Sequence, residues 1–162
     1  MTAASSDSAR LCFRRPRADP VKGELASLAF RDVGRPEADL LGVEYIGDPV
    51  DTNLVVANAS HWLLDGTGLS NGDTIPGMLG YEVDAMRRNT NQMNLVAVFE
   101  SQAEDLTKNR TLLCHGTVYN APGGAFVFSA GTIQWSWGWD DYNGDHYQLR
   151  TSRWNRNVDI IT

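Results

Sequence analysis

The stretch from residue 111 to residue 133 constrains the fold more than any other part of this sequence. Two runs with strand character, 111–120 (TLLCHGTVYN) and 125–133 (AFVFSAGTI), flank the tetrapeptide Ala121-Pro122-Gly123-Gly124. Proline and glycine supply the backbone angles that tight turns need, so this pattern predicts an antiparallel β-hairpin. We therefore expect a sheet in which at least two strands are neighbours along the chain.

Two shorter runs predict further strands. Residues 53–57 (NLVVA) and 94–100 (NLVAVFE) are apolar and contain β-branched side chains, which is typical of buried strands. The polar residues 101–109 that follow predict a short surface helix or a loop.

Helices are expected near both ends of the sequence, which gives a mixed α/β composition. Pro36 suits a first helical position and Glu37 suits a first turn, so a short helix is predicted to begin the block 36–46. Residues 147–161 are predicted to form a second helix. Its apolar positions lie approximately on one helical face and are Leu149, Trp154, Val158 and Ile161.

The region between the first two predicted strands is rich in glycine. Residues 58–84 (NASHWLLDGTGLSNGDTIPGMLGYEVD) hold five glycines and Pro76. This density predicts successive tight turns and an ordered loop, without a regular element. Apolar side chains such as Trp62 and Leu79 are interleaved to anchor it, and long anchored loops often carry function.

Composition narrows the class of protein. A chain of 162 residues is enough for one domain, and we assign residues 1–35 to a polar, basic arm or docking segment and 36–162 to the domain. The net charge of −6 argues against a nucleic-acid partner. No apolar run approaches the roughly 20 residues that a transmembrane helix needs.

Cysteine content and the first residues suggest the compartment. The sequence has only Cys12 and Cys114, which form neither a disulfide framework nor a zinc motif. Residues 1–10 lack the apolar core of a signal peptide. A cytoplasmic location without membrane contact is therefore expected.

The clearest candidates for chemistry lie at the end of the glycine-rich stretch. Glu82 and Asp84 alternate, so in an extended segment both carboxylates share one face. Two like charges there would raise one pKa and suit acid–base work, or they would bind a cation. The structural alternative is that they accept hydrogen bonds from the amides of the turns.

Other motifs for catalysis are weak. No GxSxG sequence is present, and Cys114 precedes His115 on a predicted strand, where neighbours point to opposite faces and cannot form a nucleophile–base pair. His61 and Asp65 lie within 24 residues of Glu82 and Asp84, but the four show no metal-ligand spacing. No metal ligand is therefore assigned.

Three tryptophans, Trp135, Trp137 and Trp139, are spaced by two. In an extended conformation they would form one aromatic face. An exposed face would bind sugar rings or bases, and a buried one would belong to the core or to an interface, which we expect.

Taken together, several blocks resemble the carboxyl-terminal part of the large (beta) subunit of N,N-dimethylformamidase and its bacterial relatives. The resemblance covers roughly residues 37–160. The residues that carry it are 58–62 (NASHW), 66–69 (GTGL), 75–84 (IPGMLGYEVD) and 124–135 (GAFVFSAGTIQW).

This resemblance implies an α/β fold, the carboxyl-terminal portion of a class I glutamine amidotransferase-like protein. It also implies hydrolysis of a non-peptide amide C–N bond by a single iron ion, held by two tyrosines and a carboxylate, and a small helical partner subunit. Tyr45, Tyr81 and Tyr119 cannot be matched to those ligands, which the resemblance places in a region preceding this segment.

The resemblance also suggests roles for individual residues. It assigns catalysis to Glu82 and, as a second candidate, to His61. Tyr81, Asp84 and Trp62 are expected to contact substrate.

Two functions follow as hypotheses. The first is a domain that hydrolyses a small formamide-type substrate and is inactive without the metal-binding region. The second is a non-catalytic binding or assembly module that uses the tryptophan face. An exposed sheet edge would favour a homo-oligomer or a further subunit.

Overall fold

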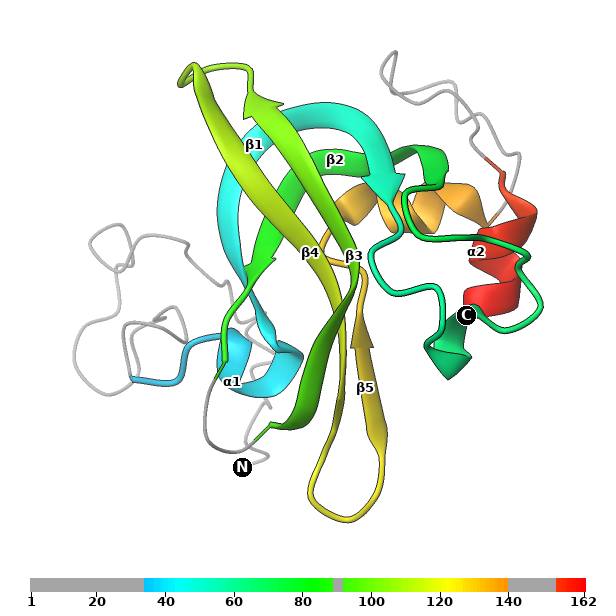
Figure 1. Ribbon diagram of the computed structural model, residues 1–162. Helices are drawn as coiled ribbons and strands as arrows, with labels where there is room; N and C mark the ends of the chain where they lie inside the picture. The colour runs from blue at the N-terminus through cyan, green and yellow to red at the C-terminus, as the bar shows by residue number, and fades with distance from the viewer. Residues whose placement is uncertain (1–33, 89–91, 140–153) are drawn as a thin grey trace, which may run out of the picture. The chain divides into compact units, whose positions relative to one another are not determined.

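The computed structural model describes residues 34–88, 92–139 and 154–162 (Figure 1). By their contacts the residues divide into Met1–Pro36 and Glu37–Thr162, and the fold below is that of the second unit. It consists mostly of two antiparallel sheets with a few short helices. The predicted amino-terminal arm lies almost wholly outside the described residues.

The first sheet pairs two long strands, β1 (Val43–Val55) and β2 (Thr74–Met86). Both bend strongly in Figure 1, and irregularities interrupt their register at three places. The predicted strand at 53–57 is therefore the end of a much longer one. The helix predicted to begin 36–46 is short, α1 (Ala38–Leu41), because Gly42 ends it in a left-handed conformation and β1 starts at the next residue.

The prediction of a loop over residues 58–84 is correct for its first half and wrong for its second. Residues 58–73 form an ordered loop that contains the 3-10 turn η4 (Trp62–Leu64). From Thr74 onward the chain is strand β2, although this strand contains Pro76, Gly77 and Gly80. Ile75, Met78 and Val83 are fully buried along it, and this apolar burial outweighs the low strand propensity of proline and glycine.

The second sheet has the strand order β3-β4-β5, with β3 at Met93–Asp105, β4 at Arg110–Asn120 and β5 at Phe126–Ser129. The predicted hairpin is confirmed, with Asn120 opposite Phe126. The expectation of a helix or loop over 101–109 is wrong for its first five residues, which continue β3. Their side chains alternate between buried and exposed, as a strand with one buried face requires.

The two sheets pack on one shared core. Phe99, Leu54, Ile75 and Leu79 are among its fully buried side chains, and each contributes about 1.5–3 kcal/mol to stability relative to exposure. Isolated bridges connect each sheet to a residue just beyond a strand of the other, at Phe99–Val56 and Val83–Thr132.

The tryptophan series does not form the predicted face. Residues 133–138 adopt the 3-10 helix η5 (Ile133–Gly138), and at three residues per turn a spacing of two places side chains on different faces. Trp135 is buried, with its ring 5.8 Å from Phe99 and 5.4 Å from Phe128. Trp139 is 50% exposed. Trp137 is half-buried, so the expectation of burial holds fully for Trp135, in part for Trp137 and not for Trp139.

The last helix, α2 (Arg156–Ile161), is capped by Asn155, whose side chain accepts from the amide of Asn157 at 2.9 Å. Most of the predicted helix before it, up to residue 153, lies outside the described residues. Within the described ranges, no helix has the length and apolar character to cross a membrane.

Candidate functional site

Glu82 and Asp84 line the same pocket, as their spacing predicts. Both belong to β2 and are half-buried. The pocket has a volume of about 280 Å³. The segment 129–133 forms one wall, and the other lining residues include Leu41 and Val43.

The wall of the pocket is a short segment that runs beside β2. The backbone amide of Asp84 donates to the carbonyl oxygen of Gly131 at 2.9 Å, and Val83 and Thr132 form a bridge. Thr132 Oγ1 accepts a hydrogen bond from Gly80 N at 2.8 Å and donates one to Gly80 O. These bonds fix the wall relative to the strand that carries both carboxylates.

Glycine is required at two positions for the wall to approach this closely. Gly131 has a φ of +70°, and a Cβ there would lie 2.0 Å from the carbonyl oxygen of His115. Gly80 has a φ of +150°, and a Cβ there would lie 2.2 Å from the carbonyl oxygen of Val50. A side chain at either position would push apart the strands that meet beside the pocket.

The chemistry of the pocket is that of hydrogen-bond acceptors. Its described lining includes two carboxylates and no Lys, Arg or His. The hydroxyl of Ser129 donates to Leu41 O at 2.8 Å and that of Thr132 to Gly80, so both hydroxyl protons are used within the fold. Leu41, Val43 and Ile133 give it apolar sides. Such a site can orient a water molecule or accept a proton beside a small apolar group.

His61 and Trp62 lie on a different element and do not line this pocket. His61 caps η4, because its Nδ1 accepts from the amide of Leu63 at 3.2 Å. Burial lowers the pKa of His61, and the charge of Asp65 opposes this shift. Trp62 packs against the ring of His61 at 5.4 Å. A cap role explains the position of His61 without catalysis.

Tyr81 is exposed and precedes Glu82 on the strand, so its side chain emerges from the other face. Of the five predicted site residues, the structure therefore groups Glu82 with Asp84 and His61 with Trp62, and it leaves Tyr81 apart. Thr132 was not among the predictions. The Gly-Thr pair after the hairpin is its only sequence signal, because the bond to Gly80 spans 52 residues.

Tyr45 and Tyr119 do not fit the role of iron ligands. Tyr45 donates to Asp48 Oδ1 at 2.8 Å, and this hydrogen bond, with burial and nearby carboxylates, raises the pKa of Tyr45 to about 12. A metal ligand must lose its proton, which this environment opposes. Tyr119 donates to Leu40 O at 2.6 Å. Across the ranges described, no group of three or more His, Cys, Asp or Glu could hold a metal ion.

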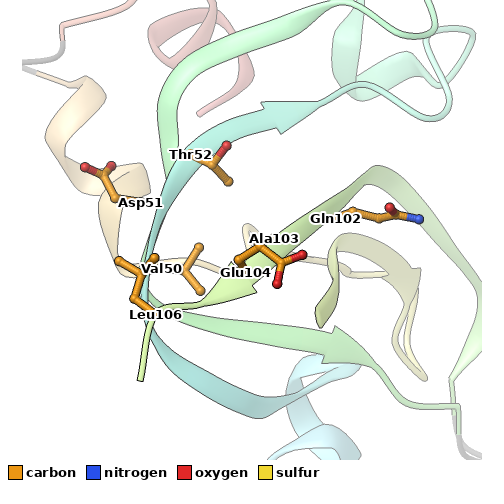
Figure 2. A pocket seen from close by; sticks show the side chains of 7 residues that line it. All are labelled: Val50, Asp51, Thr52, Gln102, Ala103, Glu104 and Leu106. Atoms are coloured by element: carbon orange, nitrogen blue, oxygen red, sulfur yellow. The ribbon is translucent and has the colours of Figure 1, made fainter. Parts of the chain in front are cut away.

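A second pocket, of about 260 Å³, lies between β1 and β3 (Figure 2). Asp51 and Thr52 of β1 and Gln102 and Glu104 of β3 are part of its lining. It combines these polar groups with Val50, Ala103 and Leu106. We assign this pocket no chemistry.

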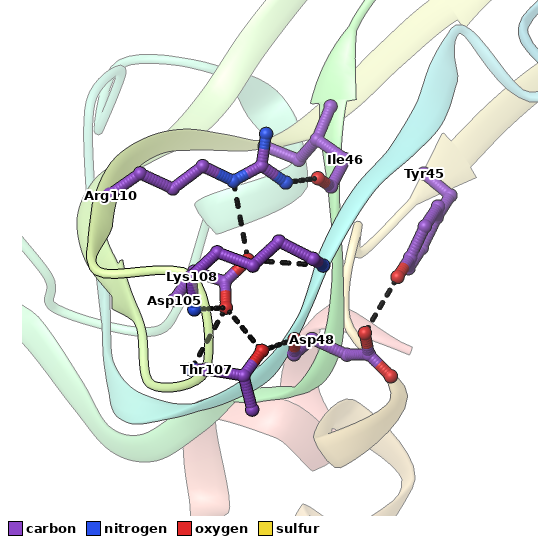
Figure 3. Close-up of polar contacts among 7 residues, drawn as sticks. All are labelled: Tyr45, Ile46, Asp48, Asp105, Thr107, Lys108 and Arg110. Carbon is purple, nitrogen blue, oxygen red and sulfur yellow. Dashed lines mark hydrogen bonds and ion pairs between the residues drawn. The ribbon is translucent and has the colours of Figure 1, made fainter.

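The buried carboxylate of Asp105, close to this pocket in sequence, is structural (Figure 3). Its oxygens accept from Thr107 N, Thr107 Oγ1 and Lys108 N at 3.1, 2.9 and 3.0 Å, and from Arg110 Nε at 3.3 Å. Burial alone would raise the pKa of Asp105, but these hydrogen bonds outweigh it and hold the pKa well below its usual range. Arg110 also donates to Ile46 O at 2.6 Å, which ties the β3–β4 turn to β1.

Comparison with known proteins places this chain in a family. Residues 3–148 match the family model described as N,N-dimethylformamidase beta subunit-like, C-terminal. The match contains the carboxylate-bearing strand and the hairpin, and it begins upstream of the segment over which the sequence resemblance was evident. No curated protein and no solved structure matches the chain. The chain belongs to the N,N-dimethylformamidase beta subunit-like C-terminal family.

Proposed function

We propose that this chain serves in the hydrolysis of the C–N bond of a small formamide-type substrate. The observation that carries this proposal is the family match over residues 3–148. The pocket beside β2 is the proposed substrate site.

The pocket suits part of this reaction. Glu82 would orient the attacking water and accept its proton, and Asp84 would hold the water from the same face. Leu41, Val43 and Ile133 would contact the N-alkyl groups of the substrate.

Among the described lining residues of the pocket, no side chain has a free hydrogen-bond donor that would polarise the amide carbonyl. Stabilising the developing negative charge on that oxygen needs a hydrogen-bond donor or a cation, and the described lining presents carboxylates instead. We therefore propose that the chain requires a further region or subunit for activity. We also propose a class I glutamine amidotransferase-like architecture. The pairings of the described strands are all antiparallel, so the parallel sheet of such an architecture would have to lie outside these strands.

The test uses the protein purified from its source cells with whatever associates with it, without a chelating tag. Release of dimethylamine from N,N-dimethylformamide is measured for the unaltered protein, for Glu82→Gln and for the control Glu104→Gln. Glu104 is exposed and bonded to Thr111 at 2.8 Å, away from the proposed site. We expect a loss of about 10²–10⁴-fold in kcat for Glu82→Gln only. Full activity of Glu82→Gln would refute the assignment.

The second candidate function is a role in assembly, and the surface that supports it is the pair Trp62 and Phe126, which lies outside the tryptophan series 135–139. Trp62 and Phe126 are both half-exposed and pack edge to face with ring centroids 4.9 Å apart. Exposed aromatic pairs are favoured at interfaces. We propose that this pair contributes to a homo-oligomer. Sedimentation should give a smaller mass for Trp62→Ser than for the unaltered chain, and equal masses would remove this candidate.

We also propose a cytoplasmic location. Cys114 is a buried free thiol, and a chain with two cysteines and no disulfide framework suits a reducing compartment. Fractionation of the source cells tests this proposal.

A further inference from the structure

The imidazole of His115 connects three strands. His115 is buried on β4. Its Nδ1 accepts a hydrogen bond from the backbone amide of Met86, the last residue of β2, at 3.2 Å. Its Nε2 lies 3.4 Å from Oε2 of Glu100, the residue opposite it on β3.

These contacts define the protonation state of the ring. Because Nδ1 accepts a hydrogen bond from the N–H of Met86, it carries no proton itself, and the single proton of the neutral ring is on Nε2, facing Glu100. A second proton would have to be added at Nδ1. Two N–H groups would then face each other, and the hydrogen bond from Met86 could not persist.

Burial of the His115 ring and the charge of Glu100 shift the pKa of His115 in opposite directions. Burial lowers the pKa of His115, and the charge and hydrogen bond of Glu100 partly raise it again. The nearest other charged groups along the chain of β2 are Asp84 and Arg87, and Arg87 forms an ion pair with Glu44 of β1. The 130–133 segment that packs on the backbone of His115 carries no titratable side chain.

The bond to Met86 is the side-chain link between β4 and the end of β2. Two residues earlier, the amide of Asp84 donates to the backbone carbonyl oxygen of Gly131 at 2.9 Å, a bond that does not involve the His115 ring. Protonation therefore acts on the Met86 amide, whereas the amide of the next residue, Arg87, donates to Gly42 O at 3.0 Å and keeps its own acceptor.

We propose that His115 is a proton-operated latch that holds the end of β2 on β4 when neutral and releases it when protonated. The released segment begins at Met86, next to the strand residues that carry the pocket carboxylates. The latch does not depend on the proposed amide hydrolysis, and its test needs no substrate.

The experiment is amide hydrogen exchange by NMR on the full chain between pH 4.5 and 7.5. Protection factors, which remove the intrinsic pH dependence of exchange, are measured for Met86 and for Asp84. The Cε1–H shift of His115 gives its titration midpoint in the same samples. We expect the Met86 protection factor to fall at least tenfold on acidification with the midpoint of His115, below pH 6.5, while that of Asp84 stays constant. A constant Met86 protection factor, or a midpoint unlike that of His115, would overturn the latch.

Two variants separate the latch from general acid unfolding. His115→Asn places an amide oxygen near the position of Nδ1 without a titratable group, so Met86 protection should become independent of pH. If this variant does not fold, Glu100→Gln serves instead, because removal of the negative charge disfavours the protonated ring. The shared midpoint of Met86 and His115 should then move to lower pH, and an unmoved midpoint would also overturn the proposal.

Discussion

Thr132 Oγ1 makes two hydrogen bonds to one residue of strand β2, accepting from Gly80 N at 2.8 Å and donating to Gly80 O. Gly80 is buried, so both of its backbone polar groups would otherwise lack water. One hydroxyl therefore satisfies two buried groups and aligns the pocket wall with β2.

Thr132→Val should destabilise the fold by about 1–3 kcal/mol, because it leaves buried polar groups of Gly80 unsatisfied. Urea unfolding measures this difference. Thr111→Val is the matched control, since Thr111 Oγ1 bonds to Glu104 on the surface, and it should change the free energy of unfolding by less than about 0.5 kcal/mol. Equal effects of the two substitutions would contradict the role of Thr132.

Gly131→Ala should be far more harmful than Gly123→Ala. Both glycines have a positive φ, +70° and +97°, so both substitutions carry the same kind of backbone strain. A Cβ at Gly123 meets nothing within 4 Å, whereas one at Gly131 would lie 2.0 Å from His115 O. We expect about 1 kcal/mol for Gly123→Ala and at least about 2 kcal/mol more for Gly131→Ala, measured by urea unfolding. A similar loss at both positions would mean that the contact with His115 is relieved at little cost.

Asp105→Asn should weaken the dependence of the protein's stability on pH in acid solution. The hydrogen bonds in Figure 3 depress the pKa of Asp105 in the folded chain below its ordinary value of 3.8. The stabilisation is therefore complete above that value and is lost as the pH falls from 3.8 towards the folded-state pKa. Thermal unfolding between pH 2 and 7 should show a lower Tm for the variant at pH 7 and a smaller difference at pH 2. Asp73→Asn, on an exposed turn, should keep the unaltered pH profile.

Trp135 and Trp139 provide a matched pair for the core. The indole nitrogens of both lie 3.3 Å from Thr162 Oγ1, but only Trp135 is buried. Trp135→Ala should cost about 3–5 kcal/mol and Trp139→Ala about 1 kcal/mol or less. Chemical denaturation followed by far-UV circular dichroism gives both values. Equal costs would indicate that the two rings share one environment, as the spacing of two had suggested.

Cys114 should resist alkylation until the protein unfolds. Burial, with a further contribution from the charge of Asp84, raises the pKa of this thiol to about 12. At pH 8 the reactive thiolate is therefore scarce, and the side chain is fully buried. Mass spectrometry of the peptide that contains Cys114 after iodoacetamide treatment, with and without 6 M urea, measures its labelling. Rapid labelling in native buffer would show that this strand opens readily.

The hairpin was predictable because its signals are local. Ala121-Pro122-Gly123-Gly124 dictates a turn whatever the rest of the chain does, and the strands on either side need only each other. The alternation of Glu82 and Asp84 was equally local, and it placed both carboxylates on one pocket.

Strand β2 was not predictable from its own residues. Pro76, Gly77 and Gly80 weaken a strand in isolation, and the reason for a glycine at position 80 is the carbonyl of Val50 and the side chain of Gln134, neither of which lies nearby in sequence. The continuation of β3 past Glu100 was missed because its alternation buries polar residues, and the partner of buried Ser101 is the amide of Val55, 46 residues away on β1. Tertiary contacts, in both cases, overrule local preference.

The bonds between Thr132 and Gly80 also bear on the order in which the protein is made. A ribosome delivers Gly80 well before Thr132, which lies 52 positions later, and the segment between them includes the whole β3–β4 hairpin. The carboxylates of β2 therefore emerge without the wall that will enclose them, and the intervening hairpin can form first from contacts close in sequence. The pocket is consequently among the last parts of the domain to acquire its shape, so a nascent or interrupted chain would carry the acidic strand without a formed site.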